Sequence, residues 1–203
     1  APFLNGNKHK IWEYSPYEQT LLLDIDYMIR SDSLLHSFDH YTGPAMFDNA
    51  ISLRNELPGP RERFLFDAGI PMWWSTVVYF DRTDVSKTFF DLWAHVADNY
   101  EFYQYLYNFP GKLFRTDYCV SIAVHILNGM TAGDTVNSLP GFLLNMDQKD
   151  DIVEVRNRDW IMLSNDTAKQ WENIVVKVTD QDMHCMNKRA ILRHKKNIWE
   201  NNT

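Results

Sequence analysis

The sequence predicts an α/β fold in which helices flank a mixed β-sheet, and three observations support this prediction. Two apolar runs of strand length, residues 19–24 and 75–80, each end in acidic residues. A long amphipathic repeat over residues 85–107 has the apolar spacing of a helix. Several short segments rich in β-branched residues between positions 139 and 178 predict further strands.

A chain of 203 residues is long enough for one domain with a sizeable core, and we expect a single domain over residues 1–203. Residues 1–18 are polar with scattered aromatic side chains, which predicts an N-terminal loop. Residues 194–203 are polar and basic and are expected to form a C-terminal tail.

The first strand is predicted at residues 19–24, where a continuous apolar run is too short for a helix. Such a run is typical of a strand buried on both faces in a parallel part of a sheet. Ser31 and Asp32 then predict the cap of a short helix that reaches Phe38. Residues 40–63 contain glycines and prolines and are expected to form a loop around a short helical turn.

After the strand at 75–80, the helix predicted at 85–107 carries an aromatic stripe that we expect to lie in the core. A second helix is predicted at 117–127, where Asn128 and Gly129 provide a stop signal. Four short strands and a basic C-terminal helix follow; the strands are expected at residues 141–144, 152–155, 160–163 and 174–178.

Composition excludes several classes of protein. The contents of 45% hydrophobic and 23% charged residues are ordinary for a globular protein. A net charge of -7 argues against general binding to nucleic acid or to an anionic membrane. No stretch approaches the roughly 20 apolar residues of a membrane span, and no signal-peptide pattern opens the sequence. Cys119 and Cys185 are expected to be buried free thiols, which fits a cytoplasmic setting.

The strongest functional signal is the pair Asp24 and Asp26 at the carboxyl end of the first predicted strand. This end of a strand is where α/β sheets usually place ligands. Strand alternation predicts that the two carboxylates lie on the same side and reach one cation. Carboxylates suit Mg²⁺ or Mn²⁺, which share their remaining positions with phosphate oxygens. A solvated acidic turn is the alternative for a bare Asp-x-Asp.

Three other residues add to this signal. His184 is a candidate third metal ligand, and Lys188 follows at a spacing that lets an ammonium reach a phosphate held by the same ion. Asp117 places an acid at the start of a predicted helix. Each also has a structural interpretation: a hydrogen-bonded histidine, a solvated charge and a helix cap.

Together these segments resemble the GT-A glycosyltransferases, most closely the family-8-like, glycogenin-like branch and related glycosyltransferase-like proteins of phages and bacteria. The segments that carry the resemblance are Ser15-Pro16-Tyr17-Glu18-Gln19-Thr20-Leu21-Leu22-Leu23-Asp24-Ile25-Asp26, Phe80-Asp81-Arg82-Thr83, Phe114-Arg115-Thr116-Asp117, and His184 with Lys188. The resemblance implies a GT-A-like fold. Under this resemblance, we expect the βα units that open such a fold and bind the nucleotide to be missing or truncated before the strand at 19–24.

The resemblance also implies roles for individual residues. Asp24, Asp26 and His184 would hold Mn²⁺ or Mg²⁺, and Lys188 would contact the diphosphate of a nucleotide-sugar donor, most simply a UDP-sugar. Asp117 lies near the position of an acidic motif that contacts the sugar in family-8-like enzymes. The implied activity is sugar transfer by a glycosyltransferase or its catalytic portion. The sequence leaves the acceptor and the oligomeric state open.

Two other functions remain open at this point. One is a non-catalytic structural or binding module that reuses a glycosyltransferase scaffold, for example in a viral particle or a protein complex. The other is a two-metal phosphoryl-transfer enzyme, which would need further carboxylates near the pair, such as Asp67 or Asp81.

Overall fold

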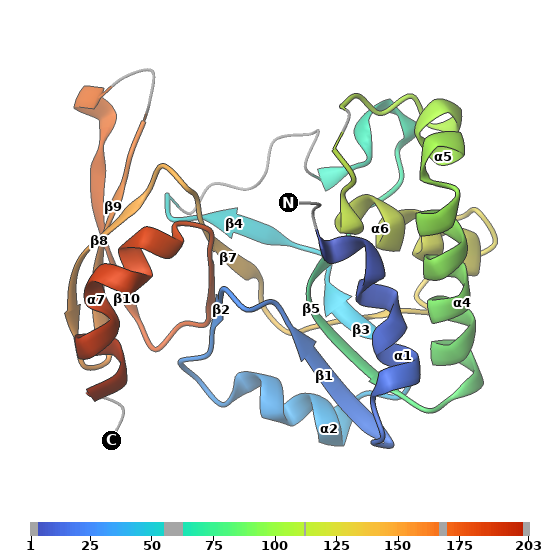
Figure 1. Ribbon diagram of the computed structural model, residues 1–203, viewed down its shortest axis with the longest axis horizontal. Coiled ribbons are helices and arrows are strands. Elements are labelled where there is room, and N and C mark those ends of the chain that lie inside the picture. The colour runs from blue at the N-terminus through green and yellow to red at the C-terminus, as the bar shows by residue number, and fades with distance from the viewer. Residues whose placement is uncertain (1–3, 55–62, 112, 167–169, 201–203) are drawn as a thin grey trace. The chain divides into compact units, whose positions relative to one another are not determined.

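The computed structural model describes residues 4–54, 63–111, 113–166 and 170–200, and it contains both helices and strands (Figure 1). Two of the sheets in the described residues combine parallel and antiparallel pairs, and together with the helices they confirm the α/β fold class. By its contacts the chain divides into two compact units; unit 1 is Ala1–Leu23, Leu35–Asn49 and Pro58–Phe142, and unit 2 is Asp24–Leu34, Ala50–Leu57 and Leu143–Thr203. The single domain expected over residues 1–203 stays a prediction, since compact units of this size also occur within one domain.

Unit 1 contains one sheet and most of the helices. Its strands are β1 (Gln19–Leu23), β3 (Ala45–Phe47), β5 (Trp74–Asp81) and β6 (Asn137–Ser138). Its helices are η1 (Leu4–Lys10), α1 (Ile11–Tyr14), α2 (Ser37–His40), η3 (Phe66–Ala68), α4 (Asp84–Asp98), α5 (Tyr100–Leu106) and α6 (Thr116–Leu127). The helix η2 (Ser33–His36) spans the point in the chain where unit 2 gives way to unit 1.

The strand predicted at 19–24 exists as β1, but the prediction that it is buried on both faces in a parallel part of a sheet is wrong. The sheet order is β1-β5-β3-β6, so among the described residues β1 is an edge strand, and it pairs antiparallel with β5. Its side chains are half-buried rather than buried. An apolar run indicates burial, but it carries no information about the direction of the neighbouring strand, which long-range pairing decides.

Aromatic side chains form the core of unit 1, as expected for the stripe on the helix after β5. Phe89, Trp93 and Val96 of α4 are fully buried. The ring centroid of Phe90 lies 4.7 Å from that of Phe80 on β5, in an edge-to-face arrangement. The aromatic content of the chain is therefore used largely for packing.

The N-terminal loop predicted at residues 1–18 is wrong for residues 4–14, which form η1 and α1. Tertiary packing accounts for the difference. The Trp12 ring stacks on Phe90 at 5.5 Å between centroids, and the Arg82 guanidinium lies over the Trp12 ring at 4.5 Å from its centroid. Such contacts stabilise a short helix that its own sequence does not favour.

The helix predicted at 85–107 is two helices, α4 and α5, with a break at Asn99. The Asn99 side-chain amide donates to the carbonyl of His95 at 2.8 Å, and its backbone leaves the helical region. An asparagine side chain competes in this way with the helical hydrogen bonds. The helix predicted at 117–127 is confirmed as α6.

The loop predicted at residues 40–63 is also wrong in part, because it contains β3 and, in unit 2, β4 (Ala50–Ser52). Each strand has three residues, too few to show an alternating pattern. Residues 55–62 of this prediction lie outside the described part of the chain.

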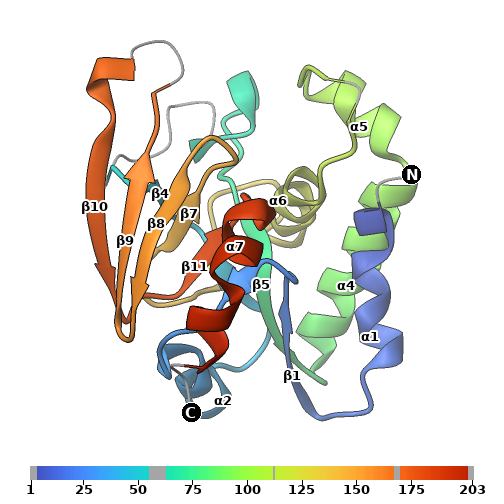
Figure 2. The ribbon, with the colours of Figure 1, turned by 60° about the vertical axis from the view of Figure 1, so that its left-hand side comes forward.

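Unit 2 consists mainly of strands, as predicted for residues 139–178. Its other strands are β2 (Tyr27–Met28), β7 (Leu143–Met146), β8 (Asp151–Arg156), β9 (Asp159–Ser164), β10 (Ile174–Thr179) and β11 (Met183–Cys185). Its helices are η4 (Gln170–Glu172) and α7 (Lys188–Glu200). Two sheets result, with orders β10-β9-β8 and β2-β11-β7-β4 (Figure 2).

The tail predicted at residues 194–203 is wrong up to residue 200, because α7 continues through this segment. Ala190, Ile191 and Ile198 recur at helical spacing and are buried. His194, on the same side, lies with Nε2 2.9 Å from the carbonyl oxygen of Ile152 on β8. The apolar side of α7 therefore packs against β8, and its basic side remains exposed.

Candidate metal site

The two carboxylates of the Asp-x-Asp motif lie in a turn that follows β1. The strand ends at Leu23, and the backbone N–H of Tyr27 donates to the carbonyl of Asp24 at 3.0 Å. Ile25, between the two acids, is 95% exposed. The prediction that strand alternation aligns Asp24 and Asp26 is therefore wrong in its cause: the turn, not the strand, brings their carboxylates together.

His184 lies beside this turn because β11 is paired on both sides. It is opposite Tyr27 of antiparallel β2 and opposite Asn145 of parallel β7. The backbone N–H of Cys185 also donates to the carbonyl of Asp26 at 2.8 Å, which ties the turn to β11. His184 Nε2 is consequently 3.4 Å from Asp26 Oδ1.

The potential ligand atoms of Asp24, Asp26 and His184 all lie within 4.8 Å of one another. In the described part of the chain, no other group of three or more histidine, cysteine or acidic residues is so arranged. The donor set fits a divalent cation, since two carboxylates and an imidazole leave positions for other oxygen ligands. Because imidazole is a softer ligand than carboxylate, this set suits Mn²⁺ better than Mg²⁺.

Lys188, the first residue of α7, reaches the same carboxylate from another side. Its Nζ lies 3.2 Å from Asp26 Oδ2. The Asp26 side chain is 14% exposed, whereas that of Lys188 is 60% exposed. Asp26 is thus held in place while the ammonium group is free to turn toward solvent. Lys188 therefore lies beside a carboxylate that the sequence predicts as a metal ligand.

These neighbours keep Asp26 ionised. The hydrogen bond from His184 is the largest cause, and together with Lys188 it outweighs burial and lowers the pKa of Asp26 to about 2. A carboxylate with such a low pKa offers its charge to a cation at any physiological pH. The polar partners therefore prepare this residue to act as a ligand.

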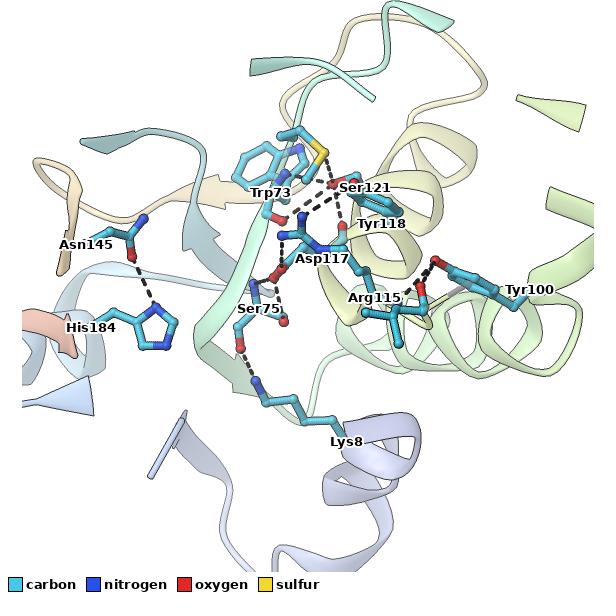
Figure 3. Close-up of polar contacts among 12 residues, drawn as sticks. Lys8, Trp73, Ser75, Tyr100, Arg115, Asp117, Tyr118, Ser121, Asn145 and His184 are labelled. Atoms are coloured by element: carbon cyan, nitrogen blue, oxygen red, sulfur yellow. Dashed lines mark hydrogen bonds and ion pairs between the residues drawn. The ribbon is translucent and has the colours of Figure 1, made fainter. Parts of the chain in front are cut away.

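Asn145 is a member of this site that the sequence prediction missed. Its Oδ1 lies 3.1 Å from His184 Nδ1 (Figure 3), whereas Asp26 lies near the other ring nitrogen, Nε2. The parallel pairing of β7 with β11 creates this contact between residues far apart in the chain. The available signal was a lone amide in the otherwise apolar run Leu143-Leu144-Asn145-Met146.

Asp117 belongs to unit 1 and is not part of this cluster. Its Oδ1 accepts hydrogen bonds from the backbone N–H of Ser75 at 3.0 Å and from the Ser75 hydroxyl at 2.9 Å (Figure 3). Arg115 Nη2 lies 3.2 Å from its Oδ2. No side-chain cap is formed at the start of α6, so the cap interpretation is wrong and Asp117 instead joins α6 to β5.

The carboxylates considered for a second metal also lie in unit 1. Asp81 accepts hydrogen bonds from the Thr83 hydroxyl at 2.6 Å, the Ser86 hydroxyl at 2.9 Å and the backbone N–H of Gly43 at 2.9 Å. These bonds organise the turn before α4, which is a structural role. Asp67 is exposed on η3.

The remaining sequence expectations concern cysteines and membrane spans. Cys119 and Cys185 are buried free thiols, as predicted, and burial raises the pKa of Cys185 to about 12. No helix in the described ranges is long and apolar enough to cross a membrane.

Comparison of the chain with protein families, curated proteins and solved structures found no match. The residues of this site and their geometry are therefore the basis for assigning a function.

Proposed function

We propose that this protein is a metal-dependent glycosyltransferase, or the catalytic portion of one, that uses a nucleotide-sugar donor such as a UDP-sugar. One observation carries the proposal: the ligand atoms of Asp24, Asp26 and His184 lie within 4.8 Å of one another, and Lys188 reaches the same carboxylate. A divalent cation with a positively charged side chain beside it is a common arrangement for binding a diphosphate.

Each residue has a distinct task in this proposal. Asp24 and Asp26 supply negative charge, and His184 supplies a neutral nitrogen ligand on a strand that fixes its position. Lys188 turns from Asp26 to a phosphate oxygen, a movement that its exposed side chain permits. The bound cation neutralises the charge that develops on the leaving diphosphate. The acceptor remains open, and Mn²⁺ is the preferred cation of the pair Mn²⁺ and Mg²⁺.

A second candidate is a non-catalytic binding or structural module built on the same scaffold. The contacts of Asp117 favour it, because Ser75 and Arg115 engage both oxygens of the acid to which the resemblance assigns sugar binding. A module of this kind would retain the fold without turning over a donor.

Calorimetric titration of Mn²⁺, with and without UDP, tests the metal and diphosphate site. We expect the wild type to bind Mn²⁺ and to bind UDP only when Mn²⁺ is present. Asp26→Asn should weaken Mn²⁺ binding at least about tenfold, or roughly 1.4 kcal/mol, because one of two carboxylate charges is lost. Glu154→Gln is the matched control, since Glu154 is an exposed acid of unit 2 that pairs with Arg156.

Turnover distinguishes the two candidates. With Mn²⁺ and a panel of UDP-sugars, a glycosyltransferase should release UDP slowly even without its acceptor, and Asp26→Asn should abolish the release. Binding of Mn²⁺ and UDP with no release from any nucleotide sugar would favour the non-catalytic module. Equal Mn²⁺ affinity in the wild type and Asp26→Asn would refute the site itself.

A further inference from the structure

Asn145 is the polar residue of an otherwise buried strand. Its neighbours on β7, Leu143, Leu144 and Met146, are at most 6% exposed. Asn145 itself is half-buried, and an amide partly withdrawn from water is stabilised when it has a hydrogen-bond partner. The partner in this structure is His184, whose Nδ1 lies 3.1 Å from Asn145 Oδ1 (Figure 3).

This contact determines how the imidazole can serve a metal. In the metal-free protein Nε2–H donates to Asp26. With Nδ1–H donating to Asn145 Oδ1, a cation that binds Nε2 displaces only that Nε2 proton and takes the lone pair it leaves. Nε2 is the atom that lies on the side of the carboxylates, 3.4 Å from Asp26 Oδ1. One nitrogen of the His184 ring thus makes the hydrogen bond to Asn145, and the other is placed to bind the cation.

The backbone holds both partners of this hydrogen bond in place. His184 and Asn145 are directly paired in the parallel β11–β7 ladder, and β7 is paired on its other side with β4. The ring orientation is therefore set by two neighbouring strands rather than by a mobile loop.

We propose that Asn145 is a positioning residue: it selects the orientation and tautomer in which His184 Nε2 binds the divalent cation. This inference rests on the proposed function, since it concerns the same metal site. Groups that orient a metal-bound histidine typically change metal affinity by about 10- to 100-fold. We expect an effect in this range when the acceptor oxygen is removed.

A purely structural role for Asn145 predicts a different outcome. Leucine has the same branching at Cγ as asparagine and suits the apolar strand, so Asn145→Leu should keep or raise thermal stability. A structural role would then leave Mn²⁺ affinity unchanged. The positioning role requires Asn145→Leu to lose affinity while stability is held, and Asn145→Asp, which keeps an acceptor oxygen, to retain it.

The experiment measures Mn²⁺ affinity and histidine coordination by electron paramagnetic resonance, alongside melting temperature. Asn145→Leu should bind Mn²⁺ about 10-fold or more weakly and lose the nitrogen modulation from His184. Asn145→Asp should bind at least as tightly as the wild type and keep that modulation. Asn197→Leu, at an exposed position of α7, is the matched control and should match the wild type.

The outcomes separate this inference from the proposed function. If the wild type binds Mn²⁺ with His184 coordinated and Asn145→Leu does the same, the positioning role is wrong while the metal site stands. If the wild type does not bind Mn²⁺, both the site and the role of Asn145 are overturned.

Discussion

In the proposed site, Lys188 and a divalent cation would compete for the same carboxylate, that of Asp26. Lys188 Nζ lies 3.2 Å from Asp26 Oδ2, so a cation that binds Asp26 would have a positive charge beside it. A diphosphate relieves this repulsion because it gives the ammonium another partner. The two ligands should therefore bind cooperatively, with Lys188 responsible for the coupling.

Replacing this lysine should change two affinities in opposite directions. Lys188→Met is expected to raise the affinity for Mn²⁺ alone by up to about fivefold, since an exposed charge pair contributes up to roughly 1 kcal/mol. It should lower the affinity for UDP in the presence of Mn²⁺ by about tenfold. Calorimetry measures both, with Arg189→Met as the control for the neighbouring exposed cation. A loss of both affinities would mean that Lys188 supports the fold of the site.

Asp26 should make the stability of the metal-free protein depend on pH in the acidic range. Its pKa is about 2 in the folded state, below the ordinary aspartate value of 3.8, so folding favours the ionised form, which stabilises the fold. This contribution is full above pH 4 and is lost as the pH falls toward 2.

Denaturant unfolding in EDTA tests this dependence. The free energy of unfolding of the wild type, relative to Asp26→Asn, should fall by about 1 to 2 kcal/mol between pH 5 and pH 2. A difference that stays constant over this range would show that His184 and Lys188 do not act on Asp26 as the structure indicates.

At the candidate site, the sequence predicts which residues take part more successfully than it predicts the contacts between them. Asp24, Asp26, His184 and Lys188 were each proposed from residue type and spacing, and the structure brings them together. Asn145 was missed because its contact depends on the parallel register of two distant strands.

Among the elements, α7 shows most clearly how a helix places a functional residue. Ile198, near the end of its described side chains, is 4% exposed, whereas Leu192 on the opposite side is 64% exposed. Packing of the buried side against β8 fixes the helix, and the helix in turn begins at Lys188.

Two alanine substitutions test the packing of α7. Ile198→Ala should lower the free energy of unfolding by about 2 kcal/mol, because it leaves a cavity under the helix. Leu192→Ala should change it by less than about 0.5 kcal/mol. Both are measured by denaturant unfolding. Equal effects would mean that residues 194–200 behave as the tail that the sequence predicted.

The fold was predictable where elements were long. The periodic patterns of β5, α6 and the strands β8 to β10 each extend over six or more residues, and these elements occur close to the predicted positions. The two- and three-residue strands β2, β3, β4 and β11 were missed, since so few residues show no period. The helix at Trp12 was missed because contacts with Phe90 and Arg82, not local propensity, stabilise it.

At the scale of the whole molecule, the candidate site lies within unit 2 but is made from two separate segments of the chain. Asp24 and Asp26 come from the first segment of this unit, and His184 and Lys188 come from the last. A cation bound to both segments would stabilise unit 2, since it binds the folded state only.

Hydrogen exchange should report this stabilisation locally. With saturating Mn²⁺, amide protection is expected to increase by at least about tenfold near residues 24–30 and 183–191. The amides of β5 and α6 in unit 1, which contain no proposed ligand, should change little. Mass-spectrometric exchange with Asp26→Asn as the control measures the difference. Uniform protection throughout both units would contradict a cation site confined to unit 2.

The central claim is that His184 and the Asp-x-Asp turn hold one cation that also takes a diphosphate. Electron–nuclear double resonance on the Mn²⁺–UDP complex, with ¹⁵N-labelled histidine, tests it directly. We predict a coupling to one histidine nitrogen, absent in His184→Ala but kept in His40→Ala, together with ³¹P couplings from UDP. A Mn²⁺ signal with ³¹P couplings but no histidine nitrogen, or with neither, would contradict the account.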